Sequence, residues 1–182
     1  ILVSVAKPVT VASNSDTKIS IVTSQGIIEV HLFKQKDTTA TDYFLKTIES
    51  GFYNGIIFHR IVDGFVLQGG IYDVHFHKKD MKIEKVDPFF KNNFKNKFAT
   101  VALIRHSQNH DMLTSQFFIN LANNTSLDEE ENKKNYDVIG EITSGMDVVQ
   151  KIARMKIGQR EGLYHVPFYP EEVMIKSIQI SK

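Results

Sequence analysis

The sequence predicts a mainly β protein built around a closed antiparallel sheet. Short runs with strand-like alternation of apolar and polar residues recur along most of the chain. Two segments carry apolar residues at helical spacing instead, and glycines or other turn residues separate many of the runs. The length of 182 residues is enough for one domain with a substantial core.

A β-hairpin is predicted at the start of this sheet. Residues 18–24 alternate isoleucines with polar neighbours, and residues 27–33 alternate apolar residues again. Gln25-Gly26, between the two runs, is a turn signal. The two strands should therefore be antiparallel neighbours, with one face of each in the core.

Two helices are predicted, one after the hairpin and one near the C-terminus. Residues 38–50 have aromatic and aliphatic side chains at helical spacing, and Gly51 follows as a stop signal. Residues 145–155 place their apolar side chains on one face, and Gly158 follows.

Further strand-like runs complete the predicted sheet. They span residues 57–62, 65–68, 100–105, 116–121, 138–142 and 176–181. Residues 71–98 show no comparable pattern, and we expect a long surface loop there, held by aromatic anchors. The expected anchors are Phe89, Phe90, Phe94 and Phe98.

Composition excludes several kinds of site. The chain has no cysteine, which excludes disulfides, thiol nucleophiles and zinc–thiolate centres. Its net charge is +1, without the basic excess that is typical of nucleic-acid binding. No apolar run approaches the roughly 18 residues that a membrane-spanning helix needs. We expect no nucleic-acid partner and no membrane span.

Residues 1–17 precede the predicted sheet and are treated as an N-terminal extension. Their first thirteen residues are mostly small and apolar, and Val11-Ala12-Ser13 resembles a signal-peptide cleavage region. Lys7 and Pro8 interrupt the apolar run, which favours an ordinary extension. The residues alone leave both interpretations open.

Two long motifs carry the functional information. Residues 51–70 read GFYNGIIFHRIVDGFVLQGG, with Arg60 among apolar side chains and Gln68 before a glycine pair. Residues 114–128 read TSQFFINLANNTSLD. Together these motifs resemble the signature of the cyclophilins, which are peptidyl-prolyl cis-trans isomerases, and the resemblance extends over residues 18–181.

The resemblance implies a specific fold and reaction. It implies an eight-stranded antiparallel β-barrel with a helix over each end, in a cyclophilin-like domain over residues 18–182. The expected activity is isomerisation of X-Pro peptide bonds in unfolded or flexible polypeptides during protein folding, by a monomer that needs no cofactor or metal. The family's bacterial, periplasmic members are the most similar in pattern, which favours a signal remnant and the periplasm over the cytoplasm.

Site residues follow from the family's motif positions. Arg60 matches the catalytic arginine, and Gln68 matches the glutamine that orients it. An apolar pocket is expected to hold the proline ring, with Tyr136 where many members have histidine. The expected catalytic residues are Arg60, Phe65, Gln68, Phe118 and Tyr136, and the expected substrate-binding residues are Val66, Ile104, Arg105, Gln116 and Leu127.

Four positions depart from the family pattern. Val66 stands where methionine is common, and Arg105 replaces a usual asparagine. Ile104 replaces a usual alanine, which should narrow the groove. Ser126 replaces a rim tryptophan or phenylalanine, so we expect weak cyclosporin binding.

Two other functions remain as alternatives. Ile104 and Ser126 favour a module or chaperone that binds proline-containing peptides with weak or no isomerase activity. His75 and His77 share one face of an extended segment, which could indicate a metal-binding β-barrel, but no third ligand follows in the sequence nearby.

Overall fold

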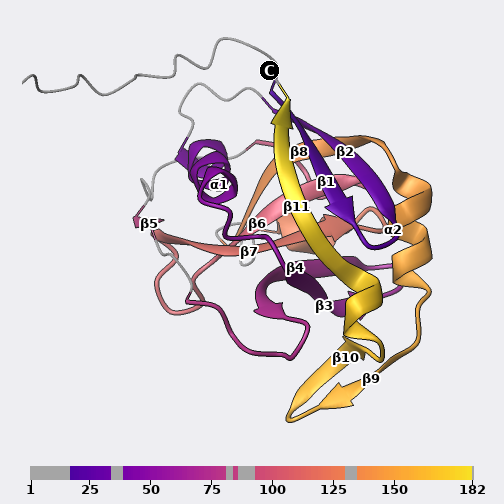
Figure 1. Cartoon of the computed structure of the whole chain (residues 1–182). Helices are drawn as coiled ribbons and strands as arrows, with labels where there is room; N and C mark the ends of the chain where they lie inside the picture. Colours follow the sequence, from indigo (N-terminus) through magenta and orange to yellow (C-terminus); the bar gives the residue numbers. More distant parts are fainter. Residues whose placement is uncertain (1–16, 34–38, 81–83, 86–92, 130–134, 182) are drawn as a thin grey trace, which may run out of the picture.

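A closed antiparallel β-barrel forms the body of the protein (Figure 1). The computed structural model describes residues 17–33, 39–80, 84–85, 93–129 and 135–181. Its strands are β1 (Lys18–Thr23), β2 (Gly26–Leu32), β3 (Ile56–Val62), β4 (Val66–Asp73), β5 (Glu84–Lys85), β6 (Thr100–Arg105), β7 (Met112–Asn120), β8 (Tyr136–Ser144), β9 (Ile157–Arg160), β10 (Leu163–Pro167) and β11 (Met174–Ser181). Its helices are α1 (Thr39–Glu49) and α2 (Met146–Ala153), with 3₁₀ turns η1 (Thr125–Asp128) and η3 (Pro170–Val173).

The order of the strands in the sheet is β4-β3-β11-β1-β2-β8-β6-β7. The barrel closes because the strands at the two ends of this order, β4 and β7, also pair with each other, and β5 pairs with the start of β7. Within the described residues this gives eight strands in the closed sheet, as the family resemblance implied. The predicted hairpin is confirmed, with Lys18 paired to His31 and Thr23 paired to Gly26.

The two predicted helices lie on opposite sides of the barrel (Figure 1). α1 packs against β7, β8 and β11, and shortly after its end at Glu49 comes Gly51, whose φ of 70° is a left-handed conformation that suits glycine. α2 packs against β2 and buries Val149, Ile152 and Ala153, the apolar face that the sequence predicted. Among the described residues, no helix combines the length and apolar character needed to cross a bilayer.

Alternate residues of the strands fill the barrel interior. In β1 and β2 the inward set is fully or almost fully buried, and in β7 it includes Phe117 and Ile119. Phe117 packs edge-on against Phe44 of α1 at 5.6 Å between ring centroids, and against Tyr53 at 5.5 Å. This core continues from the barrel to α1 and fixes which face of each strand points outward.

The predicted loop over residues 71–98 is wrong in two places. β4 continues to Asp73, and Glu84–Lys85 forms the short strand β5 beside Met112 and Leu113. The ring of Phe94 packs on that of Phe33, with 4.3 Å between centroids, but Phe94 is 39% exposed and Phe98 is 46% exposed, so neither is buried as an anchor would be. The other two expected anchors, Phe89 and Phe90, lie outside the described residues, as does the expected extension except Thr17.

Candidate active site

One row of outward-facing residues crosses five neighbouring strands. Directly paired residues of adjacent strands point to the same face of a sheet. Arg60 pairs with Gln68, Gln68 with Phe118, Phe118 with Ala102, and Ala102 with Val138. The sheet thus brings the predicted catalytic arginine, glutamine and phenylalanine to one face.

A β-bulge in β3 turns Arg60 toward that face. Phe58 pairs with Gly69 and Arg60 pairs with Gln68, so two steps along β3 oppose a single step along β4. Without the extra residue, Phe58 and Arg60 would share a face. Phe58 is fully buried in the core, while Arg60 is only partly buried on the opposite face.

Apolar side chains next to Arg60 form a second cluster, separate from the barrel core. We call it the outer patch. Its buried members are Val66, Ala102, Phe118, Leu127 and Val138, and the partly buried side chains around it are Phe33, Phe65, Ile104 and Tyr136. The patch is thus an apolar cluster on the outward-facing side of the barrel strands, beside Arg60.

Aromatic contacts set the geometry of the patch. The ring of Tyr136 meets that of Phe118 edge-on, with centroids 5.4 Å apart and an interplanar angle of 84°. The Arg60 guanidinium carbon lies 6.0 Å from the centroid of Phe65. Arg60 and Phe65 therefore border the same edge of the patch.

A chain of side-chain hydrogen bonds leads to Arg60. Gln68 Nε2 donates to Gln116 Oε1 at 3.0 Å, which leaves Gln68 Oε1 to accept from Arg60 Nη1 at 3.4 Å. The longer distance marks a weaker bond. The two glutamines orient the guanidinium while leaving its other N–H groups available.

Gly70 allows the two glutamines to meet. Its φ is 109°, and a Cβ atom there would lie 2.3 Å from the Ser115 carbonyl oxygen and 2.8 Å from the Cα atom of Gln116. Any side chain would therefore push β4 away from β7 beside the Gln68–Gln116 hydrogen bond.

The Arg105 side chain does not join the patch. Its guanidinium makes a bidentate ion pair with Asp137, with Nε–Oδ2 at 2.7 Å and Nη2–Oδ1 at 3.0 Å. Nη1 also donates to the His110 carbonyl oxygen. Both charged groups are almost fully buried, so any contact of Arg105 with a peptide would have to come from its backbone.

The remaining predicted residues lie at the edges of the patch. Ile104 and Tyr136, paired across β6 and β8, are partly exposed. Leu127 is held in η1, where the neighbouring Ser126 is exposed. The sequence analysis missed Ala102, Val138 and Phe33, although the strand alternation could have indicated the first two.

A titratable group lies directly beside Arg60. His59 is 6% exposed, and its ring meets that of Tyr72 at 5.0 Å. Burial, reinforced by the positive charge of Arg60, lowers the pKa of His59 to about 4. His59 is therefore neutral near pH 7 and adds no positive charge to the patch.

His75 and His77, the two candidate metal ligands, lie in a turn that follows β4. The backbone N–H groups of His75 and His77 both donate to Asp73 Oδ1, at 2.8 and 2.9 Å, and both residues are exposed. Across the ranges that the structure describes, no cluster of three or more His, Asp or Glu is placed to hold a metal ion.

Comparisons with known proteins show which family this chain is similar to. The family model described as "Cyclophilin type peptidyl-prolyl cis-trans isomerase/CLD" matches residues 18–180. Peptidyl-prolyl cis-trans isomerase A of Dickeya dadantii is 36% identical, over 94% of this chain and 88% of its own. Peptidyl-prolyl cis-trans isomerase B of Escherichia coli is also 36% identical, over 88% and 97%.

Solved structures show the same fold. The crystal structure of a cyclophilin-type peptidyl-prolyl cis-trans isomerase of Cryptosporidium parvum matches with a TM-score of 0.71 at 21% identity. The match covers 92% of this chain and 99% of that one.

Proposed function

This chain belongs to the cyclophilin-type peptidyl-prolyl cis-trans isomerase family, and on that premise we propose that its outer patch isomerises X-Pro peptide bonds. Rotation about a peptide bond is opposed by resonance, with a barrier of about 18–20 kcal/mol. The cis and trans forms before proline differ by only about 0.5–1 kcal/mol, yet they exchange over tens to hundreds of seconds. The enzyme therefore needs only to stabilise the twisted state.

Arg60 is proposed to stabilise that state through a hydrogen bond. In the planar amide the proline nitrogen is a poor acceptor, because its lone pair is delocalised into the carbonyl. As the bond twists, the lone pair returns to nitrogen, and a donor fixed beside it binds the twisted state more tightly than either planar one. The planar guanidinium, oriented by Gln68, supplies such a donor. No covalent bond forms or breaks.

The outer patch is proposed to hold the proline ring during rotation. Phe118 is a buried member of the patch and meets the ring of Tyr136, and Phe65 and Leu127 belong to the same cluster. If the proline ring is held in place, the carbonyl group that precedes it can rotate while the ring stays fixed. Val66 is β-branched and therefore restricted about χ1, which stiffens this part of the patch.

One observation carries this proposal: the fold places a hydrogen-bond-oriented arginine at the edge of an apolar patch that lies outside the core. A buried core arginine would have its donors consumed, as Arg105 does. Among the described residues, Arg60 uses Nη1 to bond Gln68, and it lies beside the apolar patch.

The test is a protease-coupled isomerisation assay on a short X-Pro peptide. Arg60→Ala should lower kcat/KM at least about 10²-fold, which corresponds to roughly 3 kcal/mol of lost transition-state stabilisation. Arg160→Ala is the control, because Arg160 is exposed in β9 and contacts the ring of Phe76, outside the patch. Wild-type activity without loss in Arg60→Ala would refute the mechanism.

The alternative function is a proline-peptide binding module with weak or no isomerase activity. It is favoured by Ile104, which narrows the edge of the patch, and by exposed Ser126, which supplies no rim. Saturable binding of X-Pro peptides by a wild-type protein with no measurable turnover would favour this alternative.

We further propose that the natural substrates are flexible or unfolded polypeptides in the periplasm, and that cyclosporin binds weakly. The open position of the patch on the outer surface of the barrel supports access by extended chains. The absence of an aromatic side chain at Ser126 supports weak inhibitor binding. Titration calorimetry with cyclosporin on wild type and Ser126→Trp tests the latter, and tight wild-type binding would contradict it.

A further inference from the structure

Three buried asparagines lie under one end of the outer patch. Asn120 at the end of β7 is fully buried, and Asn96 and Asn124 are 3% and 7% exposed. Buried amides are costly unless their polar atoms are hydrogen-bonded. Their placement in one cluster therefore needs a reason beyond filling space.

The three amides form a directional chain of hydrogen bonds. Asn124 Nδ2 donates to Asn120 Oδ1 at 2.7 Å, and Asn120 Nδ2 donates to Asn96 Oδ1 at 3.0 Å and to Thr100 Oγ1 at 2.9 Å. Asn96 Nδ2 in turn donates to Asp128 Oδ1 at 2.9 Å. Each amide donates toward the carboxylate, so successive bonds polarise and strengthen one another.

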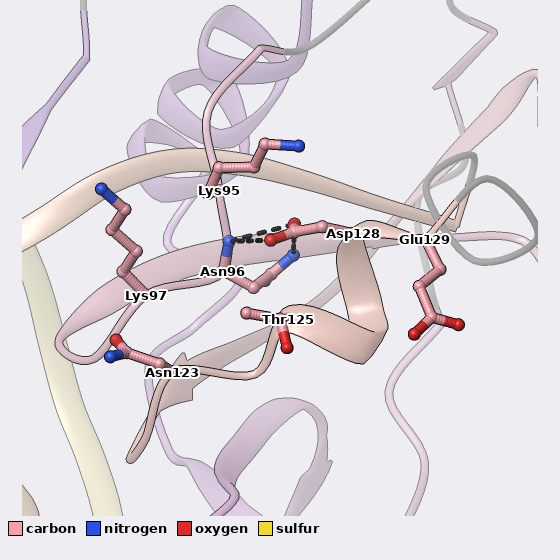
Figure 2. Close-up of a pocket in the computed structure, with 7 residues that line it drawn as sticks. All are labelled: Lys95, Asn96, Lys97, Asn123, Thr125, Asp128 and Glu129. Carbon is pink, nitrogen blue, oxygen red and sulfur yellow. Dashed lines mark hydrogen bonds between the residues drawn. The ribbon is translucent and has the colours of Figure 1, made fainter.

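The carboxylate end of this chain lies in the turn that carries Leu127. Figure 2 shows Asp128 reaching from η1 to the amide of Asn96, and its oxygens also accept the Asn96 backbone N–H at 3.1 and 3.2 Å. The chain also borders an open surface pocket of about 560 Å³, to which Lys95, Lys97 and Asn123 contribute. The Asp128 end of the chain can therefore be reached from solvent.

The other end of the chain holds Phe65. Asn124 Nδ2 uses its second hydrogen to donate to the Phe65 carbonyl oxygen at 2.9 Å, and that oxygen also accepts the Leu121 backbone N–H at 2.9 Å. Phe65 itself sits in the tight turn between β3 and β4, where its N–H donates to the Val62 carbonyl oxygen. The backbone of Phe65 is thus fixed from β7 as well as from its own turn.

We propose that Asn124 is a positioning residue for Phe65, and that the chain from Asn124 through Asn120 and Asn96 to Asp128 fixes the position of Phe65 relative to Leu127 in the outer patch. Both residues belong to the patch, and Asp128 directly follows Leu127. Asn124 holds both through their backbones, because its side chain donates to the Phe65 carbonyl oxygen and its own carbonyl oxygen accepts the Leu127 N–H at 3.0 Å. It acts on the reaction through the ring of Phe65.

Asn124→Ala tests this directly, with Asn123→Ala as a matched control. Asn123 is the exposed neighbour, and its Oδ1 accepts the Phe98 backbone N–H at 2.9 Å outside the chain. Asn124→Ala should lower kcat/KM about 10-fold, because it removes the side-chain hydrogen bonds to Asn120 and to the Phe65 carbonyl oxygen. Asn123→Ala should leave kcat/KM within about 2-fold of wild type. Equal kcat/KM in the two variants would overturn the proposal.

A double-mutant cycle with Phe65→Ala separates positioning from general destabilisation. If Asn124 acts through Phe65, Asn124→Ala should change kcat/KM less than about 2-fold once the ring has been removed. If the asparagine only stabilises the fold, its effect should be the same in both backgrounds, and that additivity would contradict the proposal.

Asp128→Asn tests the carboxylate end of the chain. The change is nearly isosteric, so it should disturb folding less than Asn124→Ala does. It removes the charge but leaves an acceptor, so kcat/KM should fall about 2–3-fold, again only when Phe65 is present. An effect that persists in the Phe65→Ala background would contradict the chain's role.

A second readout does not depend on activity. The NMR amide nitrogen of Val66, which shares a peptide bond with the Phe65 carbonyl, should shift in Asn124→Ala and Asp128→Asn but not in Asn123→Ala. An unshifted Val66 signal would overturn the inference even if the enzyme is active. The inference rests on the isomerase function proposed above, and wild-type turnover reports on that function separately.

Discussion

The two faces of the barrel wall use the same strands for different purposes. On the inner face of β7, Phe117 is fully buried among rings and aliphatic side chains that continue into α1. On the outer face, the next residue, Phe118, is also buried, but in a small patch bordered by Arg60 and Gln68. Burial alone therefore does not distinguish a core residue from a site residue. The face on which it lies does.

This difference shows how a stable fold can carry a reactive surface. The inner face is mostly apolar and holds the barrel together. The outer patch is also apolar, but it does not belong to the core that holds the barrel together. The hydrogen-bonded side chains of Arg60, Gln68 and Gln116 lie along its edge. Adjacent residues in one strand can then be varied almost independently, one for stability and the other for function.

The largest effects are expected from alanine substitutions at two adjacent phenylalanines, Phe117 and Phe118. Phe117→Ala should destabilise the protein by about 3–5 kcal/mol, because the cavity is enclosed on every side. Phe118→Ala should cost about half as much, since the vacated space opens to solvent, yet should lower kcat/KM at least about 10-fold. Urea unfolding and the isomerisation assay measure both. Similar unfolding and activity losses for the two variants would break the distinction between the faces.

His59 sharpens the comparison because it is buried next to the outward-facing Arg60. The pKa of His59 is about 4 in the folded protein, against 6.5 in an exposed chain. The unfolded state therefore binds the proton first as the pH falls. The contribution of neutral His59 to the free energy of unfolding should be fully present above pH 6.5. It should be lost progressively between pH 6.5 and 4, by up to roughly 3 kcal/mol.

Urea unfolding across this pH range measures the effect of His59, with His59→Gln as the comparison. The variant lacks the titrating group and should show a flatter pH profile. Identical profiles in the two proteins would mean that another group controls acid stability.

A smaller effect is expected at the edge of the patch. Ile104 lies beside Tyr136 and should hinder large residues before proline, so wild type should prefer alanine or glycine there. Ile104→Ala should broaden this preference, by the roughly 1–3 kcal/mol that one methylene in an apolar pocket is worth. Measuring kcat/KM over X-Pro peptides that differ only at X tests this. A flat wild-type profile would show that Ile104 does not contact the substrate.

Much of the fold was predictable because alternation directly reports which face of a strand is buried. The β1–β2 hairpin, the buried face of α2 and the opposite orientations of Phe117 and Phe118 follow from periodicity alone. The β9–β10 hairpin was missed, because two glycines interrupt a short, largely exposed segment and remove its alternation.

The site was less predictable because it depends on local irregularity and on partners distant in sequence. Motif position selected Arg60, but the bulge that turns it outward depends on how β3 pairs with β4. Arg105 was expected to lie in the strand segment whose backbone contacts substrate, which stays a prediction, but the ion pair of its side chain with Asp137, 32 positions later, was not foreseen. Single residues do not reveal such partners, and the buried chain of asparagines was missed for the same reason.

The central claim is that Arg60 acts through the fixed direction of its N–H donors, with charge alone being insufficient. Comparing Arg60→Lys with Arg60→Ala in the isomerisation assay tests this most directly, because lysine keeps the charge but replaces the planar fork with a mobile ammonium. We predict that kcat/KM of Arg60→Lys falls to within about 10-fold of the value for Arg60→Ala, and that both variants retain wild-type stability. Near-wild-type kcat/KM in Arg60→Lys would contradict the account, since a positive charge near the outer patch would then suffice.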